Sequence, residues 1–211
     1  MKWLDGLLLC LIKGGDMSYK IERTVCGIGF NSGGNYETSL NKKQLKVYTL
    51  WAAMMNRCYN PIYLKQKPNY IGCTVCEEWH DFQNFAKWFY SERFHIFKYE
   101  LDKDILIKGN KIYSPETCCL VPHSINMLIT NSGSKSGGYP QGISLHKGTG
   151  KFRVRLGVYG KIKYIGLFNS EALALSAYKK AKESHIRDVA LENKDLIEFS
   201  VFEALMNWQV E

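Results

Sequence analysis

Three short segments of alternating apolar and polar residues, separated by glycine turns, constrain this sequence more than any other feature. The clearest is Lys151 to Leu156, in which cationic and apolar side chains alternate strictly. Such alternation is typical of a strand with one buried face, and the glycines between the segments favour tight turns. A helix is expected next, because Ser170 precedes apolar residues at helical spacing; they are Ala174, Leu175, Tyr178 and Ala181. Residues 139–190 therefore predict a three-stranded antiparallel sheet packed on one helix.

The predicted middle strand separates its side chains by charge. One face carries three cations, and the opposite face, which we expect against the helix, carries Phe152, Val154 and Leu156. Two lysines of the next strand are expected to alternate in the same way and to share the basic face. This face is the predicted surface for double-stranded DNA, and its candidate binding residues are Lys151, Arg153, Arg155, Lys161 and Lys163.

The charge of the whole chain points to the same kind of partner. The 211 residues carry a formal charge of +8, and residues 139–190 hold ten Lys and Arg against three Asp and Glu, which is +7 of that total. A strongly basic segment favours a polyanionic partner such as nucleic acid. The apolar run Leu7 to Ile12 is too short to span a bilayer, so no membrane role is expected.

Seven cysteines occur at spacings that do not resemble a disulfide framework. An odd number of cysteines favours a reducing, intracellular setting. Cys73 and Cys76 form a single C-x-x-C pair, and a structural zinc site would need a second pair. We therefore expect buried free thiols and no zinc.

The chain before the sheet is expected to contain most of the helices. Apolar residues at helical spacing predict helices over 44–58 and 75–94, with a loop over 62–72 after Asn60-Pro61. Residues 101–107 alternate as in a half-buried strand, a turn at 108–111 leads to a return strand at Ile112, and Pro122 opens a short helix. The predicted fold class is α+β: a helical region with a strand–turn–strand–helix unit, then the sheet.

The polar segment 131–138 is the predicted linker between a domain over 17–130 and the sheet domain over 139–190, and residues 191–211 are expected to form a C-terminal helix. Residues 1–16 are expected to be a leader or a disordered extension. The sequence from Lys13 to Met17 is what a purine-rich ribosome-binding site before a start codon would encode, so we expect synthesis to begin at Met17.

The sheet segment resembles the APETALA2-type DNA-binding domain of plant ethylene-response factors and phage homing endonucleases. The resemblance covers 138–190 and rests on Gly142-Ile143, Gly150 to Leu156, Tyr164 to Phe168 and Glu171 to Tyr178. It implies a sheet that enters the major groove, with arginines reading guanine edges. The sequence departs from the family pattern at Ser144, His146 and Phe152, so the resemblance does not imply a particular target site.

Residues 101–126 resemble a divergent HNH nuclease of phages and mobile elements, which implies a ββα unit that holds one Mg²⁺ or Mn²⁺. The resemblance makes Asp102 and Asn126 the metal ligands. Lys103 stands where the base histidine belongs, and a lysine, with an ordinary pKa near 10.4, stays protonated at neutral pH. Alternation would place Asp104 on the face of Asp102, as a substitute base or second ligand, so the candidate catalytic residues are Asp102, Asp104 and Asn126.

Two functions follow from these resemblances. The first is a homing-endonuclease-like enzyme that nicks or cuts DNA in the cytoplasm of a bacterial host. The alternative is a catalytically inactive, sequence-specific DNA binder or regulator derived from such a nuclease. A third hypothesis is a protein-interaction module whose basic face binds an acidic protein. The sequence leaves the oligomeric state open.

Overall fold

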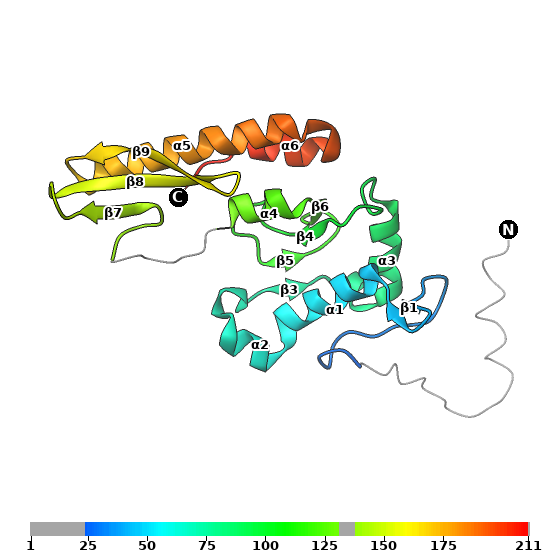
Figure 1. Cartoon of the computed structure of the whole chain (residues 1–211). Helices are drawn as coiled ribbons and strands as arrows, with labels where there is room; N and C mark the ends of the chain where they lie inside the picture. Colours follow the sequence, from blue (N-terminus) through cyan, green and yellow to red (C-terminus); the bar gives the residue numbers. More distant parts are fainter. Residues whose placement is uncertain (1–23, 131–137, 211) are drawn as a thin grey trace, which may run out of the picture.

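The computed structural model describes residues 24–130 and 138–210, and it has the α+β composition expected from the sequence. The expected leader over 1–16, the start at Met17 and nearly all of the expected linker lie outside these residues. Figure 1 shows one lobe built from the helices that follow the N-terminus, a second lobe with a three-stranded sheet, and a small strand-and-helix unit between them. None of the helices in the described ranges is long and apolar enough to cross a membrane.

The first lobe consists of short helices and a two-stranded hairpin. The hairpin is β1 (Ser39–Leu40) and β2 (Lys43–Gln44), and the helices are α1 (Lys46–Tyr59), α2 (Pro61–Gln66), η1 (Pro68–Tyr70), η2 (Glu77–His80) and α3 (Phe82–Ser91). The helix predicted over 44–58 corresponds to α1. The segment predicted to be helical over 75–94 is divided, since Asp81 accepts the backbone N–H of Gln83 and caps a new helix.

The loop predicted over 62–72 was wrong, because this segment contains α2 and η1. The side chain of Asn60 accepts the backbone N–H groups of Ile62 and Tyr63, and Pro61 occupies the first helical position. An Asn followed by Pro therefore ends one helix and also starts the next, since Asn is a good N-cap and Pro is favoured at the first position.

The middle unit contains four short strands and one helix. β4 (Glu100–Asp102) pairs antiparallel with β6 (Cys119–Val121), β3 (Thr74–Val75) pairs parallel with β5 (Ile112–Tyr113), and α4 (His123–Ile129) follows β6. The return strand at Ile112 therefore pairs with β3 instead of with the strand before it. The expected strand over 101–107 was also too long, because the chain turns immediately after Asp102.

The second lobe has the predicted three-stranded antiparallel sheet, in the order β7 (Ile143–His146), β8 (Lys151–Val158) and β9 (Lys161–Phe168). Helix α5 (Glu171–Glu192) begins at Ser170, whose Oγ accepts the N–H of Leu173 at 3.3 Å. The expected C-terminal helix over 191–211 is shorter in the structure: the end of α5 is followed by η3 (Lys194–Leu196) and α6 (Phe199–Met206).

Gly142 fixes the entry to β7 against α5. Its φ is +80°, and a Cβ at this position would lie 2.3 Å from the ring of Tyr178 and 2.6 Å from the carbonyl oxygen of Arg155. Only glycine fits such a close approach in this backbone conformation.

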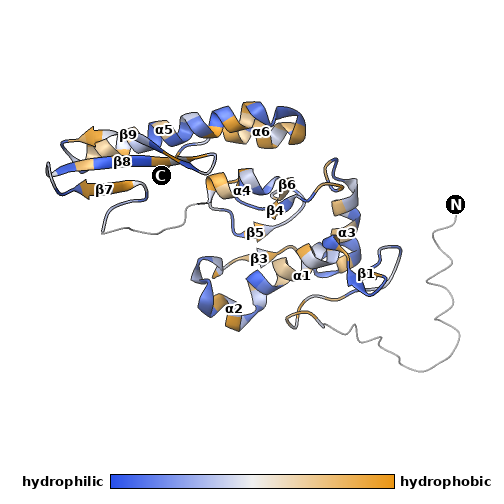
Figure 2. Ribbon diagram, viewed as in Figure 1, coloured by the Kyte–Doolittle hydropathy of each residue, from blue (hydrophilic) through white to orange (hydrophobic). Residues whose placement is uncertain are grey.

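Two hydrophobic cores lie on opposite sides of the β4–β6 ladder. Leu101 and Leu120 belong to the core formed with α1 and α3, whereas Cys119 and Val121 belong to the core formed with α4, the sheet, α5 and α6. Successive strand residues point to opposite faces, so one short ladder serves as the wall between the two cores. Figure 2 shows hydrophobic residues along α6 and β7, and among them Ile143, Val201 and Leu205 belong to this second core.

Candidate nucleic-acid interface and cleft

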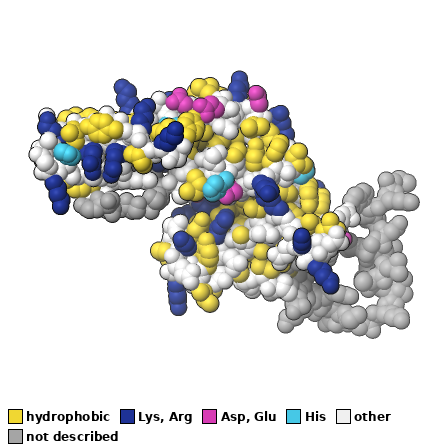
Figure 3. All heavy atoms as spheres, in the orientation of Figure 1, with side chains coloured by type: hydrophobic (Ala, Val, Ile, Leu, Met, Phe, Trp, Pro, Cys, Tyr) yellow, Lys and Arg dark blue, Asp and Glu magenta, His cyan; other side chains and the backbone are white. Residues whose placement is uncertain are grey.

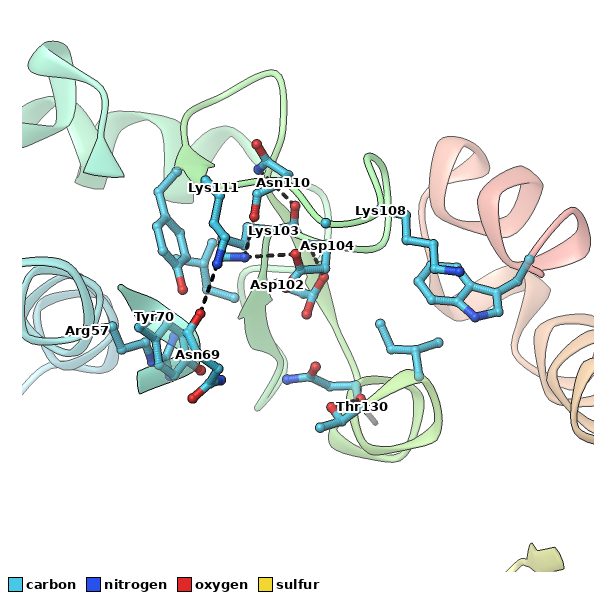
Figure 4. A pocket seen from close by; sticks show the side chains of 16 residues that line it. Arg57, Asn69, Tyr70, Asp102, Lys103, Asp104, Lys108, Asn110, Lys111 and Thr130 are labelled. Atoms are coloured by element: carbon cyan, nitrogen blue, oxygen red, sulfur yellow. Dashed lines mark hydrogen bonds and ion pairs between the residues drawn. The ribbon is translucent and has the colours of Figure 1, made fainter. Parts of the chain in front are cut away.

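A cleft of about 430 Å³ lies between η1, the loop after β4, α4 and the C-terminal segment at Trp208 (Figure 4). Asp102 and Asn126, the two predicted metal ligands, both line it. Four cationic side chains also line the cleft: Arg57, Lys103, Lys108 and Lys111. The structure therefore brings the two candidate ligands to one cavity in which cationic side chains outnumber carboxylates.

The carboxylate of Asp102 turns the chain as it leaves β4. Its Oδ1 accepts the backbone N–H groups of Asp104 at 2.7 Å and Ile105 at 2.8 Å. A short polar side chain that bonds the backbone two or three residues ahead competes with strand pairing, which explains why β4 ends here. In the described part of the chain Oδ2 has no hydrogen-bond partner.

Opposing influences act on the pKa of Asp102, and the net shift is upward. Burial raises the pKa of this carboxyl above its ordinary value, and the backbone N–H groups of Ile105 and Asp104 offset this only in part. The negative charge of Asp104 raises the pKa further, while Lys103 lowers it. A cation beside Asp102 would stabilise the ionised form that burial disfavours.

Lys103 holds the loop after β4 together. Its buried Nζ donates to Asp104 Oδ1 at 2.8 Å and to the carbonyl oxygen of Asn110 at 2.6 Å, and it lies 5.8 Å from the centre of the Tyr113 ring. Asp104 is therefore an ion-pair partner of Lys103. The expected placement of Asp104 beside Asp102 on a continuing strand was wrong, because the strand ends at Asp102.

Asn110 is a structural residue of the cleft that the sequence did not single out. Its Nδ2 donates to the carbonyl oxygens of Lys103 at 3.0 Å and Ile112 at 2.6 Å, and its Oδ1 accepts the N–H of Ile112 at 3.0 Å. Asn110 thus closes the loop from 103 to 112. The signal that could have identified it is its place after Gly109, whose φ of +73° makes the turn.

Asn126 is held at the cleft by a carboxylate outside it. Its Nδ2 donates to Glu100 Oε2 at 2.6 Å, and Glu100 Oε1 lies 2.7 Å from His123 Nδ1. Burial alone would raise the pKa of Glu100, but the hydrogen bonds from His123 and Asn126 outweigh it and the pKa lies below its ordinary value. Glu100 was not among the predicted site residues. The sequence signal that could have identified it is its position two residues before Asp102, which places both side chains on the same face of one strand.

The oxygen atoms at the cleft are of the type that a hard divalent cation prefers. Asp102 keeps Oδ2, and the bond from Nδ2 of Asn126 leaves its Oδ1 as an acceptor. Mg²⁺ is commonly held by one or two protein oxygens and retains several waters, so this pair fits it. Nowhere in residues 24–130 and 138–210 do three or more His, Cys, Asp or Glu side chains gather to hold a metal.

The register of the sheet decides which cations share its outer face. Directly opposed residues point to the same side, and the pairs are Ser144 with Arg153, and Arg155 with Tyr164. Val154 and Leu156 are buried against α5, so the outer face carries Lys151, Arg153 and Arg155, as the alternation predicts.

Lys161 and Lys163 do not share that face, which corrects the sequence expectation. Lys163 lies opposite Leu156 and Lys161 opposite Val158, and Lys163 lines a separate pocket beside α5. The cause is a bulge between Val154 and Arg155, which leaves Ile165 as an extra residue in β9. An extra residue exchanges the faces of the residues on one side of it, here Lys161 to Tyr164.

The outer face combines cations with exposed apolar side chains. Ile162 and Tyr164 of β9 are 70% and 58% exposed. In the part of the chain that the structure describes, Arg153 and Arg155 form no ion pair, and Arg153 Nε and Ser144 Oγ have no hydrogen-bond partner. Figure 3 shows Lys and Arg beside hydrophobic side chains over the sheet lobe. The outer face is therefore a basic and partly apolar surface whose cations are not neutralised internally.

Comparison of the chain with protein-family models, with curated proteins and with solved structures finds no match. The function is therefore argued from the chemistry of the outer face and of the cleft.

Proposed function

We propose that the protein binds double-stranded DNA through the outer face of the β7–β8–β9 sheet. The observation that carries the proposal is the row of three cations, Lys151, Arg153 and Arg155, which form no ion pair within residues 24–130 and 138–210 and lie beside exposed Ile162 and Tyr164. Cations without internal partners favour an anionic ligand, and a nucleic-acid duplex offers both phosphates and apolar base edges.

The dimensions of the sheet suit the major groove, which admits a two-stranded ribbon. In this arrangement Arg153 and Arg155 donate to guanine edges, and Lys151, near the start of β8, contacts phosphate. The apolar side chains of β9 would contact thymine methyl groups or sugars. The proposed setting, carried over from the resemblance, is the cytoplasm of a bacterial host.

Mobility shift with duplex DNA tests the binding proposal. The double variant Arg153→Ala, Arg155→Ala is expected to lose a few kcal/mol of binding free energy. Excess unrelated duplex DNA should compete with the labelled duplex for the protein. A module that binds an acidic protein instead of DNA would not respond to this competitor. Unchanged affinity in the double variant contradicts the proposal.

The cleft favours a second candidate function, hydrolysis of DNA phosphodiester bonds in the manner of HNH nucleases. The specific observation is that Asp102 and Asn126 line one cavity together with Arg57, Lys108 and Lys111. The cations would hold backbone phosphates, while Asp102 and Asn126 would hold Mg²⁺ or Mn²⁺. When bound, such an ion stabilises negative charge on the leaving oxygen.

Cleavage of supercoiled plasmid and host genomic DNA with Mg²⁺ or Mn²⁺ tests this second candidate. Cleavage by the wild type that is lost in Asp102→Ala and in Asn126→Ala is the expected result. Retained DNA binding without cleavage of either DNA favours the alternative, an inactive DNA binder or regulator that keeps the scaffold of a nuclease.

A further inference from the structure

We propose that the cleft binds unpaired nucleotides of single-stranded DNA, with bases stacked on Tyr70 and Trp208 and a base edge bonded to Asn69. This inference goes beyond duplex binding by the sheet, and it needs neither a metal nor hydrolysis. The choice of DNA over RNA rests on the proposed function, in which the same chain holds duplex DNA.

Two partly exposed aromatic side chains line the cleft from different elements. Tyr70 ends η1, and Trp208 follows α6. In Figure 4, Tyr70 lies with Arg57 and Asn69 on one side of the loop after β4, and Lys108 lies on the other side. The Nζ of Lys108 is 5.5 Å from the centre of the Trp208 ring, so Trp208 belongs to that second side. The cleft therefore has an aromatic wall on each side.

The turn at 108–111 connects the two walls. Lys111 Nζ donates to the carbonyl oxygen of Asn69 at 2.9 Å, which ties η1 to the turn. Lys108 Nζ donates to the carbonyl oxygen of Gln209 at 2.7 Å, which ties the C-terminal segment to the same turn. Because both walls are held before a ligand arrives, binding requires little further ordering of the protein.

The cations of the cleft supply the contacts that a nucleotide needs at its phosphate. Arg57 and Lys111 form no ion pair in residues 24–130 and 138–210, and the hydrogen bond of Lys111 goes to a neutral carbonyl. Lys103 and Asp104 pair with each other, which leaves Asp102 as the carboxylate that faces these two cations. A polyanionic backbone is therefore attracted to the cleft.

Aromatic walls distinguish an unpaired base from a base pair. In a duplex each base is stacked between its neighbours, and its hydrogen-bonding edge is taken by the partner strand. An unpaired base can stack on an aromatic side chain and offer its edge to a polar one. The volume of about 430 Å³ lies in the range of about 300–1,000 Å³ that holds small ligands, which suits a few nucleotides and not a duplex.

Asn69 is the side chain placed to read a base that stacks on Tyr70. It precedes Tyr70 in η1, it is exposed, and its side-chain amide has no hydrogen-bond partner in the part of the chain that the structure describes. An asparagine amide offers one acceptor and two donors in one plane, which matches the edge of a base.

The test measures the affinity of the full-length protein for a fluorescein-labelled oligothymidylate by fluorescence anisotropy. This strand does not pair with itself, so it presents unpaired bases. Tyr70→Ala and Trp208→Ala should each weaken binding about 5- to 150-fold, the scale of one lost stacking contact. Tyr70→Phe keeps the ring and should bind like the wild type, which separates stacking from a general loss of structure.

The chain offers a matched control for each alanine variant. Phe199 on α6 is 66% exposed and lies outside the lining of the cleft, so Phe199→Ala is the control for Trp208→Ala. Tyr90 on α3 is 39% exposed and also lies outside it, so Tyr90→Ala is the control for Tyr70→Ala. Both controls should bind oligothymidylate like the wild type, and equal losses in the controls would overturn the proposal.

Arg155→Ala separates the cleft from the sheet, whose outer face also carries an exposed ring at Tyr164. This variant should lose duplex affinity in a mobility shift and keep its affinity for oligothymidylate. If Arg155→Ala loses oligothymidylate while Tyr70→Ala and Trp208→Ala keep it, the single strand binds to the sheet and the inference is overturned.

The remaining outcomes separate this inference from the proposed function. A wild type that binds duplex DNA and no oligothymidylate overturns the inference and leaves duplex binding by the sheet in place. A wild type that binds oligothymidylate through the cleft and no duplex supports the inference and overturns the role of the sheet. Tighter binding of oligouridylate than of oligothymidylate overturns the choice of DNA.

Discussion

Arg155 of β8 lies directly opposite Tyr164 of β9, next to the bulge at Val154, so a cation and an exposed aromatic ring share the outer face. We predict that Arg155→Ala weakens DNA binding by about 1–3 kcal/mol, the usual cost of losing a contact to guanine, and that log affinity then falls less steeply with log salt because a cation has left the interface. Mobility shifts at several salt concentrations measure both quantities.

Lys163→Ala is the matched control for this variant, since it removes one positive charge from the opposite face of the same sheet. It should change the affinity much less than Arg155→Ala does. Equal losses for the two variants would mean that net charge, and not the outer face, determines binding.

Tyr164→Ala should weaken DNA binding in a different way. The exposed ring can be buried against a base or sugar, and burial of an apolar side chain contributes about 1.5–3 kcal/mol when it is complete. Because no charge is removed, the salt slope should stay at the wild-type value. The same series of mobility shifts measures this, and a reduced salt slope would show that the ring acts by positioning Arg155.

The alternation of β8 was enough to predict its two faces, because each polar or apolar side chain there follows the period of a strand. The faces of β9 could not be predicted, since the extra residue Ile165 depends on how β9 meets β8 and not on its own sequence. The same holds at the cleft. The pair Asp102 and Asn126 could be proposed from the resemblance to HNH nucleases. Glu100 shares a strand face with Asp102, but its contact with Asn126 became visible only when β4 and α4 were placed together.

Ile125 of α4 is fully buried in the core that α4 shares with the sheet, α5 and α6. We predict that Ile125→Ala lowers the free energy of unfolding by about 2–5 kcal/mol, the usual cost of such a truncation. Because this core joins residues on both sides of the 131–137 segment, denaturant unfolding should remain a single shifted transition. Two separate transitions, with only one shifted, would show that the lobes unfold independently.

The buried thiols of Cys58 and Cys118 predict how stability depends on alkaline pH. Burial raises the pKa of each thiol from 9.0 to about 12. Between these values the unfolded chain loses the proton first, so the folded state becomes less favoured as pH rises. Each thiol should therefore lower the free energy of unfolding by up to about 1.4 kcal/mol per pH unit above pH 9.

Cys118→Ala provides the comparison. It should be less stable than the wild type at pH 7, because a small cavity remains, yet lose less stability between pH 9 and 11. Urea denaturation across this pH range measures both effects. An unchanged slope in the variant would mean that Cys118 already ionises in the folded protein.

Asp102 turns the chain after β4 and is also a proposed metal ligand, and Asp102→Asn separates these two roles. An asparagine Oδ1 can still accept the N–H groups of Asp104 and Ile105, so the turn after β4 should persist. Removing the buried charge also removes its desolvation cost, so the free energy of unfolding should change by less than about 1 kcal/mol. Asp102→Ala, in contrast, loses the acceptor and should be destabilised by about 1–3 kcal/mol.

Calorimetric titration with Mn²⁺ should then show binding to the wild type and a loss of at least about tenfold in affinity for Asp102→Asn. Equal Mn²⁺ affinity for these two proteins would remove Asp102 from the metal site and leave it as the residue that turns the chain.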